Sequence, residues 1–545
     1  MAELEIKPHS DLKHLESHHE GDEALKAPVL KSSLDQLTPW QTVRRFKKAI
    51  LVCFALCIAA AADGYQINLN GNIIANAGFV KQVGVQDPKT LKYALKPQST
   101  AIWGALQSLG QLVGMVLLNP VSDRIGRKMT LYLLWTILLG SLIIESTTKT
   151  WQHWAGAKLL AGVGVGCLQA TLPIYITEWA PVNVRGGAIV AYAVINNLGS
   201  FLAPMVLFIE KNKDPLNWKV AVLTQWAFLG IMLPIFIWLP ETPSYFAARD
   251  LHDQGLAVLR RVNGNVEGYD VDAEYEVIKN IIAEERERRE AEGMIDGNWR
   301  TLLKSYGDCF KGTNLKRTIA SSLPASVQQL TGLAFLSGYA SLFFQQSGFT
   351  NAFEITTILF AVKIVAVIVI CLTTDRLGRR SMVLSFGVLC TLMLLIVGVL
   401  GQVHKNGATK IILILAACLW SVGSVGLGAL GWTFAGEVAS QKLRARTSGL
   451  GSAIAVLFGL TFNTAVPTML QTNGANLGYN TSWIFFGTSI VVLIVAVFYL
   501  PETAQRNSAE LDEMYEKGVP AWKMKKFVTD VQKAHAARNG DTIRT

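Results

Sequence analysis

Asp63 is the only carboxylate in the first long apolar stretch of this 545-residue chain. Burial disfavours the charged form of a carboxylic acid, so an acid in such a place can load and release a proton as its surroundings change. Other apolar stretches contain amides, which can hydrogen-bond a polar ligand or a neighbouring helix. Candidates among these amides are Gln107, Gln111, Asn196, Asn197 and Asn463. The chemistry that these residues offer is reversible binding and protonation.

The stretches that hold these residues are long enough to cross a membrane. The chain is 51% hydrophobic and 17% charged, with a mean hydropathy of +0.32, whereas soluble domains have about 25% charged residues. A spanning helix needs roughly 20 apolar residues and satisfies its own backbone groups. The sequence therefore predicts an all-α membrane protein with twelve transmembrane helices. The expected spans are 46–66, 98–119, 129–148, 153–177, 187–209, 219–239, 318–344, 353–373, 381–402, 410–437, 446–470 and 481–500.

The twelve spans fall into two sets of six, which sets the expected domains. A six-helix half at 46–240 is followed by a cytoplasmic loop with short helices at 241–317 and a second six-helix half at 318–503. Polar cytoplasmic tails cover 1–45 and 504–545. His14 and His18 in the first tail are interpreted as part of a solvated segment and not as a metal site.

Basic residues set the expected orientation. With the N-terminus inside, all 21 arginines fall in cytoplasmic segments, although four lysines lie in the first outside loop. We therefore expect both termini in the cytoplasm and a plasma-membrane location. The formal charge of +10 then reflects membrane topology, and no nucleic-acid partner is expected.

Three motifs occur twice, once in each half. SDRIGRK at 122–128 recurs as TDRLGRR at 374–380, EWAPVNVRGG at 178–187 as EVASQKLRART at 437–447, and LPETPSYF at 239–246 as LPETAQR at 500–506. Each pair lies at the same place in its half. The repeats indicate two pseudo-symmetric halves.

With these repeats, the chain resembles the sugar porter family of the major facilitator superfamily over nearly all of residues 46–535. It looks most like the fungal α-glucoside (maltose type) permeases. That closer likeness is carried by DGYQ (63–66), QQLTGLAFLSGYASLFFQQSG (328–348), SQKLRART (440–447) and LPETAQRNSAELDEMYEKGVPAWKMKKF (500–527). The resemblance implies a secondary active sugar transporter whose halves rock about a midplane site.

The resemblance implies sugar-binding roles for four residues. Gln328 and Gln329 match the family's paired glutamines, Tyr339 matches a later aromatic residue, and Trp432 matches a tryptophan in the tenth helix. The sequence also departs from the pattern: Ala334 and Ala193 stand where many relatives have amides, and GALGW at 428–432 lacks the usual prolines. These departures leave the substrate open among disaccharides, hexoses, pentoses, polyols and sugar acids.

The repeated motifs also place opposite charges at helix ends. The resemblance implies that they form networks that hold the two halves together on the cytoplasmic face, while anchoring of the topology is the alternative. The residues are Asp123 with Arg127, Glu178 with Arg185, Asp375 with Arg379, and Glu437 with Arg444.

Proton coupling is expected to depend on Asp63. The related permeases usually read acid-Gly-Tyr-acid here, whereas this chain has Gln66 at the second acid position. Gln111 stands where those permeases often have Glu, and Lys158 replaces the usual Arg. One acid can suffice, so we expect proton symport, with facilitated diffusion as the alternative.

Other function classes find less support. A non-transporting sugar sensor of this fold is an alternative, but such sensors tend to have longer C-terminal tails. The sequence has no HExxH motif, P-loop or Cys/His cluster, so no enzyme activity, metal or cofactor is expected, and no obligate protein partner is evident. Lys363, in the eighth span, is expected to snorkel or to pair with Glu354.

Overall fold

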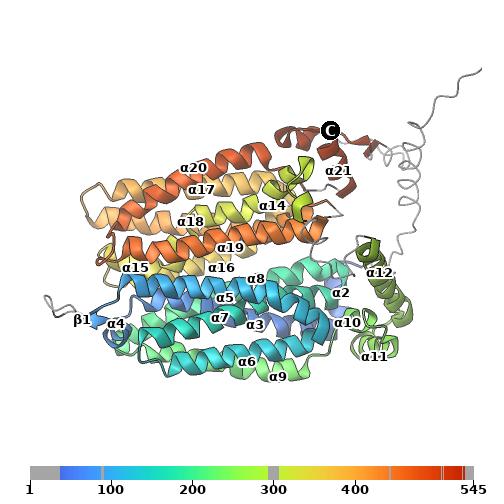
Figure 1. The fold of residues 1–545 in the computed structure, drawn as a ribbon, viewed down its shortest axis with the longest axis horizontal. Coiled ribbons are helices and arrows are strands. Elements are labelled where there is room, and N and C mark those ends of the chain that lie inside the picture. Colours follow the sequence, from blue (N-terminus) through green and yellow to red (C-terminus); the bar gives the residue numbers. More distant parts are fainter. Residues whose placement is uncertain are drawn as a thin grey trace, which may run out of the picture.

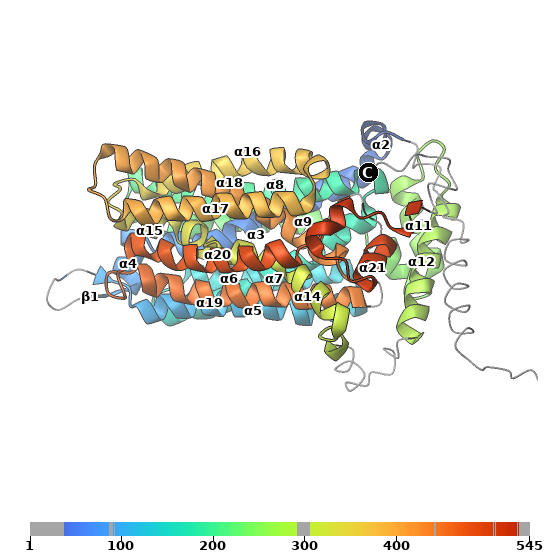
Figure 2. The ribbon, with the colours of Figure 1, turned by 90° about the horizontal axis from the view of Figure 1, so that it is seen from above.

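A computed structural model describes residues 37–86, 91, 93–291, 306–440, 443–504, 506, 508–530 and 532–533. The tail that contains His14 and His18 lies outside these residues. Two helical halves lie side by side with their long helices roughly parallel (Figures 1 and 2). One end of the bundle carries a short hairpin of β1 (Val85–Gln86) and β2 (Tyr93–Ala94), and we call it the hairpin end.

The N-terminal half contains six long helices. They are α3 (Lys47–Ile73), α5 (Pro97–Ile125), α6 (Arg127–Ser146), α7 (Trp151–Trp179), α8 (Val182–Lys213) and α9 (Lys219–Trp238). The first helix runs well past the predicted end at residue 66, because its polar C-terminal turns are satisfied internally. Asn72 Nδ2, for example, donates to Asn68 O at 2.8 Å. The short helices α2 (Pro39–Arg45) and α4 (Ala77–Val83) flank this helix.

The C-terminal half repeats this arrangement with one difference. Its elements are α14 (Gly312–Leu330), the π-helical η1 (Ala334–Gly338), α15 (Ala340–Gln346), α16 (Ala352–Leu377), α17 (Arg379–Leu400), α18 (Gly407–Glu437), α19 (Arg444–Leu470), η3 (Gly478–Asn480) and α20 (Thr481–Tyr499). The prediction of one continuous helix over 318–344 was wrong. Gly332, with φ of +89°, ends α14, and the chain resumes as a π-helical turn that Tyr339 interrupts again.

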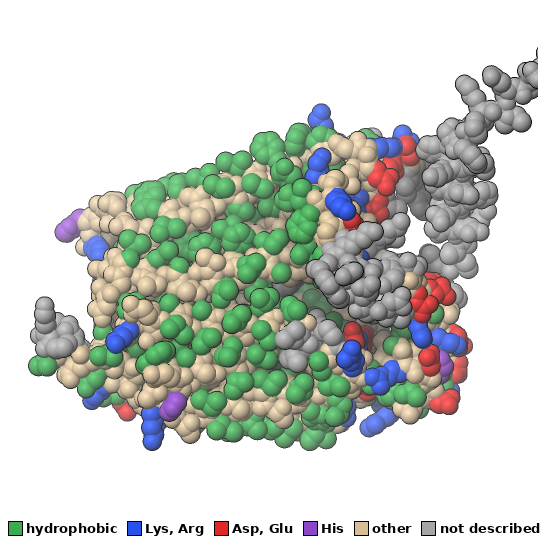
Figure 3. Space-filling model, viewed as in Figure 1, with side chains coloured by type: hydrophobic (Ala, Val, Ile, Leu, Met, Phe, Trp, Pro, Cys, Tyr) green, Lys and Arg blue, Asp and Glu red, His purple; other side chains and the backbone are tan. Residues whose placement is uncertain are grey.

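The opposite end of the bundle carries the remaining helices, and we call it the loop-helix end. These are α10 (Pro243–Ala247), α11 (His252–Asn263), α12 (Val271–Ala291), α21 (Ser508–Glu516) and η4 (Ala521–Lys526). Figure 3 shows charged side chains gathered there and a mostly hydrophobic surface along the bundle. Exposed apolar residues such as Val365, Leu372 and Val491 lie on spanning helices, as expected for contact with lipid.

Ten of the described helices are long and apolar enough to cross a membrane. The other two predicted spans correspond to α5 and to the interrupted α14–η1–α15 segment. Turns between consecutive helices are tight: Gly126 between α5 and α6 and Gly378 between α16 and α17 have φ of +99° and +83°, which favours glycine. The repeated Asp-Arg-x-Gly-Arg motif therefore forms the same turn in both halves.

Candidate functional site

Asp63 lies in the N-terminal half where four helices meet, and its side chain has 0% exposure. Gln169 Nε2 on α7 donates to both carboxylate oxygens at 3.1 and 3.2 Å, and Asn196 Nδ2 on α8 donates to Oδ2 at 2.9 Å. Gln111 Nε2 on α5 donates to Gln169 Oε1 at 2.6 Å. Within the described part of the chain, Asp63 has no Lys or Arg ion-pair partner. The Tyr192 side chain on α8 also hydrogen-bonds Asp63. Neutral side chains therefore hold this carboxylate, and we call Asp63, Gln111, Gln169 and Asn196 the Asp63 cluster.

Small residues bring two helices of the Asp63 cluster into backbone contact. A Cβ atom on Gly64 would lie 2.0 Å from Asn196 O, and one on Gly199 would lie 2.0 Å from Ala61 O. Glycine thus lets α3 and α8 approach closely, as in many membrane helix pairs. This contact places the Asn196 amide against Asp63.

Two other predicted amides of the N-terminal half have different partners. Gln107 Oε1 accepts a hydrogen bond from Asn70 Nδ2 at 2.6 Å, and Trp154 Nε1 donates to Asn70 Oδ1 at 3.1 Å. Asn197 Nδ2 donates to Ala193 O of its own helix at 2.9 Å. The structure thus groups Gln111 and Asn196 with Asp63 but not Gln107 or Asn197.

Gln328 and Gln329 end α14, just before the seventh helix is interrupted. Gln328 Nε2 donates to Ser424 O on α18 at 2.9 Å. Gln329 is half-buried and its side-chain amide has no hydrogen-bond partner among the described residues, so this amide is available to a ligand. The side chain of Trp432 lies outside the described residues.

Tyr339 and Asn463 lie where the two halves meet. The Tyr339 hydroxyl donates to Asn463 O at 3.1 Å, and Asn463 Nδ2 donates to Ser108 Oγ on α5 at 3.1 Å. Tyr339 is 3% exposed. In this conformation both residues contribute to the contact between the halves.

Further contacts join the halves toward the hairpin end, where a cavity of about 150 Å³ is lined by both halves. A Cβ atom on Gly71 would lie 1.9 Å from Gly338 O, so backbones touch there. The hydrogen bonds are Ser341 Oγ to Asn72 Oδ1 at 2.7 Å, Gln471 Nε2 to Thr100 Oγ1 at 3.0 Å, Gln345 Nε2 to Ala75 O at 3.4 Å, and Lys211 Nζ to Thr350 O. These contacts close the hairpin end.

The sequence interpretation missed a buried ion pair. Glu145 on α6 and Lys158 on α7 both have 0% side-chain exposure, and Lys158 Nζ lies 2.9 Å from Glu145 Oε1. Gln66 Nε2 donates to Oε1 at 2.6 Å, Gln225 Nε2 to Oε2 at 2.9 Å, and Ser141 Oγ to Oε1 at 3.3 Å. The sequence could have indicated this pair, because Glu145 and Lys158 are charged residues inside the predicted spans 129–148 and 153–177. We call these five residues the Glu145 cluster.

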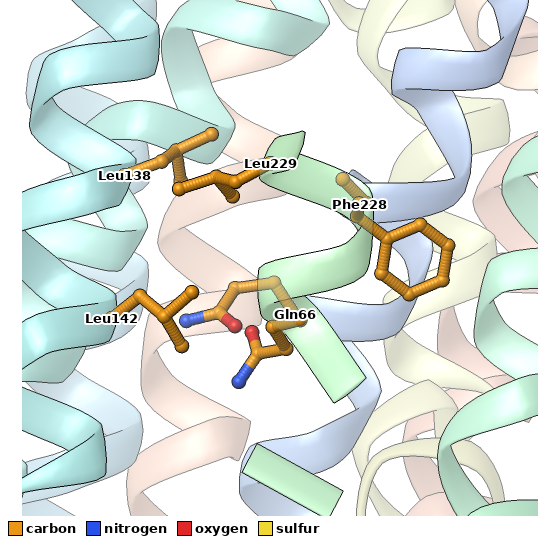
Figure 4. A pocket seen from close by; sticks show the side chains of 7 residues that line it. Gln66, Leu138, Leu142, Phe228 and Leu229 are labelled. Atoms are coloured by element: carbon orange, nitrogen blue, oxygen red, sulfur yellow. The ribbon is translucent and has the colours of Figure 1, made fainter. Parts of the chain in front are cut away.

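A small cavity adjoins the Glu145 cluster (Figure 4). Its volume is about 10 Å³, close to the minimum for one water molecule. Gln66 and Gln225 supply its polar lining, and Leu138, Leu142 and Phe228 are among the apolar residues around it. Gln66 Oε1 is buried and has no hydrogen-bond partner in the structure. A water molecule there would satisfy that oxygen.

The expectation for Lys363 was wrong on both counts. Lys363 is 4% exposed and does not snorkel, and its Nζ donates to Ser337 Oγ at 2.6 Å. Glu354 instead accepts a hydrogen bond from Asn351 at 3.1 Å. Glu354 and Lys363 are nine residues apart on one helix, about 13.5 Å along its axis, which is too far for a pair.

The predicted charge networks lie at the loop-helix end, each within one half. Arg127 pairs with Asp123 at 3.0 Å and with Glu178 at 3.2 Å. Arg379 pairs with Glu437 at 2.6 Å. The Arg185 side chain is exposed and forms no ion pair with a described residue. The side chains of Asp375 and Arg444 lie outside the described residues. The role of these charges in holding the halves together stays a prediction for another conformation.

The repeated Leu-Pro-Glu-Thr motif has a role that its sequence did not reveal. Glu241 accepts hydrogen bonds from the backbone N–H groups of Arg127 and Lys128 at 3.1 and 3.0 Å. Glu502 accepts them from Arg379 and Arg380 at 2.8 and 3.3 Å. Each carboxylate thereby caps the N-terminus of α6 or α17. Burial raises the pKa of Glu241, and these backbone hydrogen bonds oppose the shift.

The fold and these sites define a multi-pass membrane protein in which two six-helix halves enclose buried polar clusters. The profile of the family described as "Sugar (and other) transporter" matches residues 52–515. The chain belongs to this sugar transporter family of the major facilitator superfamily, whose members are transporters and not enzymes.

Similar proteins occur in fungi and bacteria. The chain is 27% identical to the MFS transporter fmqE of Aspergillus fumigatus, over 89% of this chain and 90% of that protein. It is 24% identical to the low-affinity glucose transporter HXT3 of Saccharomyces cerevisiae, over 89% of this chain and 85% of that protein. The inward open structure of the xylose transporter XylE from E. coli matches with a TM-score of 0.67 at 17% identity, covering 85% of this chain and 99% of that one. This last likeness shows the fold alone.

Proposed function

We propose that the protein imports a small sugar, with an α-glucoside as the first candidate, by alternating access coupled to a proton. The family membership supports sugar transport, and the repeated motifs support two halves that move against each other. HXT3 is named as a glucose transporter and XylE as a proton:xylose symporter. The substrates that we infer are thus a sugar and H⁺.

The proposed orientation puts the hairpin end outside the cell and the loop-helix end, with both tails, in the cytoplasm of a plasma-membrane protein. Arg127, Arg379 and Arg506 all lie at the loop-helix end, which fits the rule that basic residues stay inside. In that orientation the closed hairpin end corresponds to a conformation with the outer gate shut.

The Asp63 cluster is the observation that carries the proposal of proton coupling. A fully buried carboxylate without a cation partner is costly when charged, and protonation removes that cost. Asp63 therefore gains or loses its proton according to how well the conformation solvates it. Glu145 is different, since Lys158 and three further donors stabilise its charged form.

Facilitated diffusion is the second candidate, because two positions that are acidic in the related permeases are the amides Gln66 and Gln111 here. The test is sugar uptake by proteoliposomes with and without an imposed proton gradient, for the wild type and Asp63→Asn. We expect the wild type to accumulate sugar against its gradient. Asp63→Asn should lose accumulation by roughly tenfold or more but retain sugar exchange, because an amide keeps hydrogen bonding without carrying a proton. Full accumulation by Asp63→Asn would show that Asp63 is not the coupling group.

A further inference from the structure

Lys363 is a buried cation without a counter-charge in the described part of the chain. Its Nζ atom hydrogen-bonds Ser337 Oγ and lies 4.4 Å from the ring centre of Phe360 and 5.8 Å from that of Trp420. Cys390 on α17 is the titratable residue near Lys363. A charged ammonium inside a membrane protein usually pairs with an anion or faces a ligand path. Lys363 has one hydrogen-bond acceptor among the described residues and two aromatic rings beside it, which leaves two of its N–H groups without an oxygen acceptor.

The repeat register places Lys363 at a position equivalent to one in the Asp63 cluster. Counting back fifteen residues from Gly126 along α5 reaches Gln111, and counting back fifteen from Gly378 along α16 reaches Lys363. Gln111 contacts Gln169, the amide that holds Asp63. Lys363 is therefore the C-terminal counterpart of a residue in the proposed coupling site.

A second pair of positions supports this register. Nine residues before Glu178 is Gln169, and nine residues before Glu437 is Gly428. A Cβ atom on Gly428 would lie 2.5 Å from Gln328 Nε2, so the amide of Gln328 occupies the space beside this glycine. The C-terminal half thus presents Gln328 and Lys363 where the N-terminal half presents Gln169 and Gln111.

Lys363 also contacts the interrupted seventh helix, on which the sugar-binding candidates lie. Ser337 belongs to η1, and Trp420 beside Lys363 donates its indole N–H to Thr331 O at 2.8 Å. Thr331 lies two residues after Gln329 in the sequence. For Lys363 to bind a ligand together with the amides of Gln328 and Gln329, a local rearrangement of η1 would have to release the ammonium from Ser337.

We propose that Lys363 binds a carboxylate of the transported molecule, so that the substrate is a sugar acid such as a hexuronate. The proposal rests on the proposed transport function and replaces its first candidate, a neutral α-glucoside, with an acidic sugar. A carboxylate supplies the missing counter-charge and accepts the two unused ammonium N–H groups. The anion moves together with one proton on Asp63, so the transported pair is neutral. The rate of uptake should therefore depend on the pH gradient and should not depend on the membrane potential.

Matched sugars test the proposal on the unmodified protein. Purified full-length protein in liposomes is given galacturonate or galactose, and glucuronate or glucose, which differ in a carboxylate against a hydroxymethyl group. We expect uronate uptake to exceed that of the neutral partner by roughly tenfold or more, because a hydrogen bond to a charged group contributes about that factor. Thermal stabilisation by uronate but not by the neutral sugar is expected in detergent.

Substitutions at Lys363 test whether its positive charge, and not its contribution to folding, is needed for uronate uptake. Lys363→Gln should lose uronate uptake by roughly tenfold or more, whereas Lys363→Arg should retain most of it. Lys523→Gln, at an exposed lysine of η4, is the control for a change in net charge and should behave as the wild type. If Lys363→Gln does not fold, the shift in melting temperature that uronate causes in the wild-type protein still tests whether a uronate binds.

Three outcomes would overturn the assignment. Uptake of neutral sugars with no uptake or competition by uronates would reject the sugar acid but keep the transporter. Neutral-sugar uptake that requires chloride in the wild type but not in Lys363→Gln would make an inorganic anion the ligand. Transport of neither uronates nor neutral sugars would instead reject the proposed function itself.

Discussion

The two halves of this protein share their turns and caps but differ in their buried charges. In the N-terminal half, Glu145 and Lys158 neutralise each other inside a shell of polar side chains, and neutral groups, the amides of Gln169 and Asn196 and the Tyr192 hydroxyl, hold Asp63. In the C-terminal half, Lys363 has a single hydroxyl partner. A paired buried charge is expensive to disturb, whereas an unpaired one is free to respond to a proton or a ligand. We infer that the Glu145 cluster is structural and that Asp63 and Lys363 carry function.

Glu145→Ala should have the largest effect on stability, since it leaves the Lys158 ammonium buried without its partner. Breaking a buried pair in this way costs about 3–5 kcal/mol. We expect a large fall in the melting temperature of the purified protein and little protein at the membrane. Lys363→Met, which removes an unpaired charge, should leave the melting temperature unchanged or raise it.

The double variant Glu145→Met with Lys158→Met sharpens the same comparison. Apolar replacement of a whole buried pair is often close to neutral, so the double variant should regain most of the stability that Glu145→Ala loses. If the double variant is as unstable as the single one, the ion pair is not what makes Glu145 important. Equal destabilisation by Glu145→Ala and Lys363→Met would remove the distinction between the two halves.

Gly71 tests the contact through which the two halves act on each other. Its Cβ position lies 1.9 Å from Gly338 O, so Gly71→Ala forces the backbones apart and opposes closure of the hairpin end. We expect transport to fall by roughly tenfold, a shift of about 1.4 kcal/mol in the conformational equilibrium. A cysteine at Ala352, which lines the cavity of about 150 Å³, should become more reactive toward a maleimide.

Gly140→Ala is the matched control for Gly71→Ala. Gly140 lies on α6 with no neighbouring atom within 4 Å of its Cβ position, so this variant should transport normally. Normal transport and unchanged labelling in Gly71→Ala would mean that closure of the hairpin end is not part of the cycle.

The sequence was sufficient for the spans and for part of the site. The turns at Gly126 and Gly378 were visible as repeated motifs, and the predicted helices begin within a few residues of Arg127 and Arg379. Asp63 stood out because a carboxylate is rare in an apolar run. Its neighbour Gln169 did not, because the partner of an amide depends on which helix faces overlap.

The missed features depend on tertiary contact or on local backbone conformation. Glu145 and Lys158 interrupt two separate spans, and only the packing of α6 on α7 makes them a pair. The break of the seventh helix at Gly332 also escaped detection, because a hydropathy window averages over the four apolar residues that follow this left-handed glycine. The register of Lys363 with Gln111 was present in the repeats but had no meaning until the Asp63 cluster was seen.

The smallest expected effect compares the two capping carboxylates. Glu241 uses both oxygens: Oε1 accepts from Arg127 N at 3.1 Å and Thr242 N at 2.9 Å, and Oε2 accepts from Lys128 N at 3.0 Å. Glu502 accepts its backbone hydrogen bonds with Oε1, and its Oε2 is buried without a hydrogen-bond partner in the structure. Glutamine has one acceptor oxygen and one amide group.

Glu241→Gln therefore turns an NH₂ group toward a backbone donor, whereas Glu502→Gln can place its NH₂ where no donor lies. We expect Glu241→Gln to destabilise the protein by about 1 kcal/mol more than Glu502→Gln in thermal melts of the purified protein. The alanine variants at both positions remove the cap altogether and should cost similar amounts, which controls for the difference between the halves. An equal loss for the two glutamine variants, or a larger one for Glu502→Gln, would mean that the second oxygen of Glu241 contributes nothing and that the two caps are equivalent.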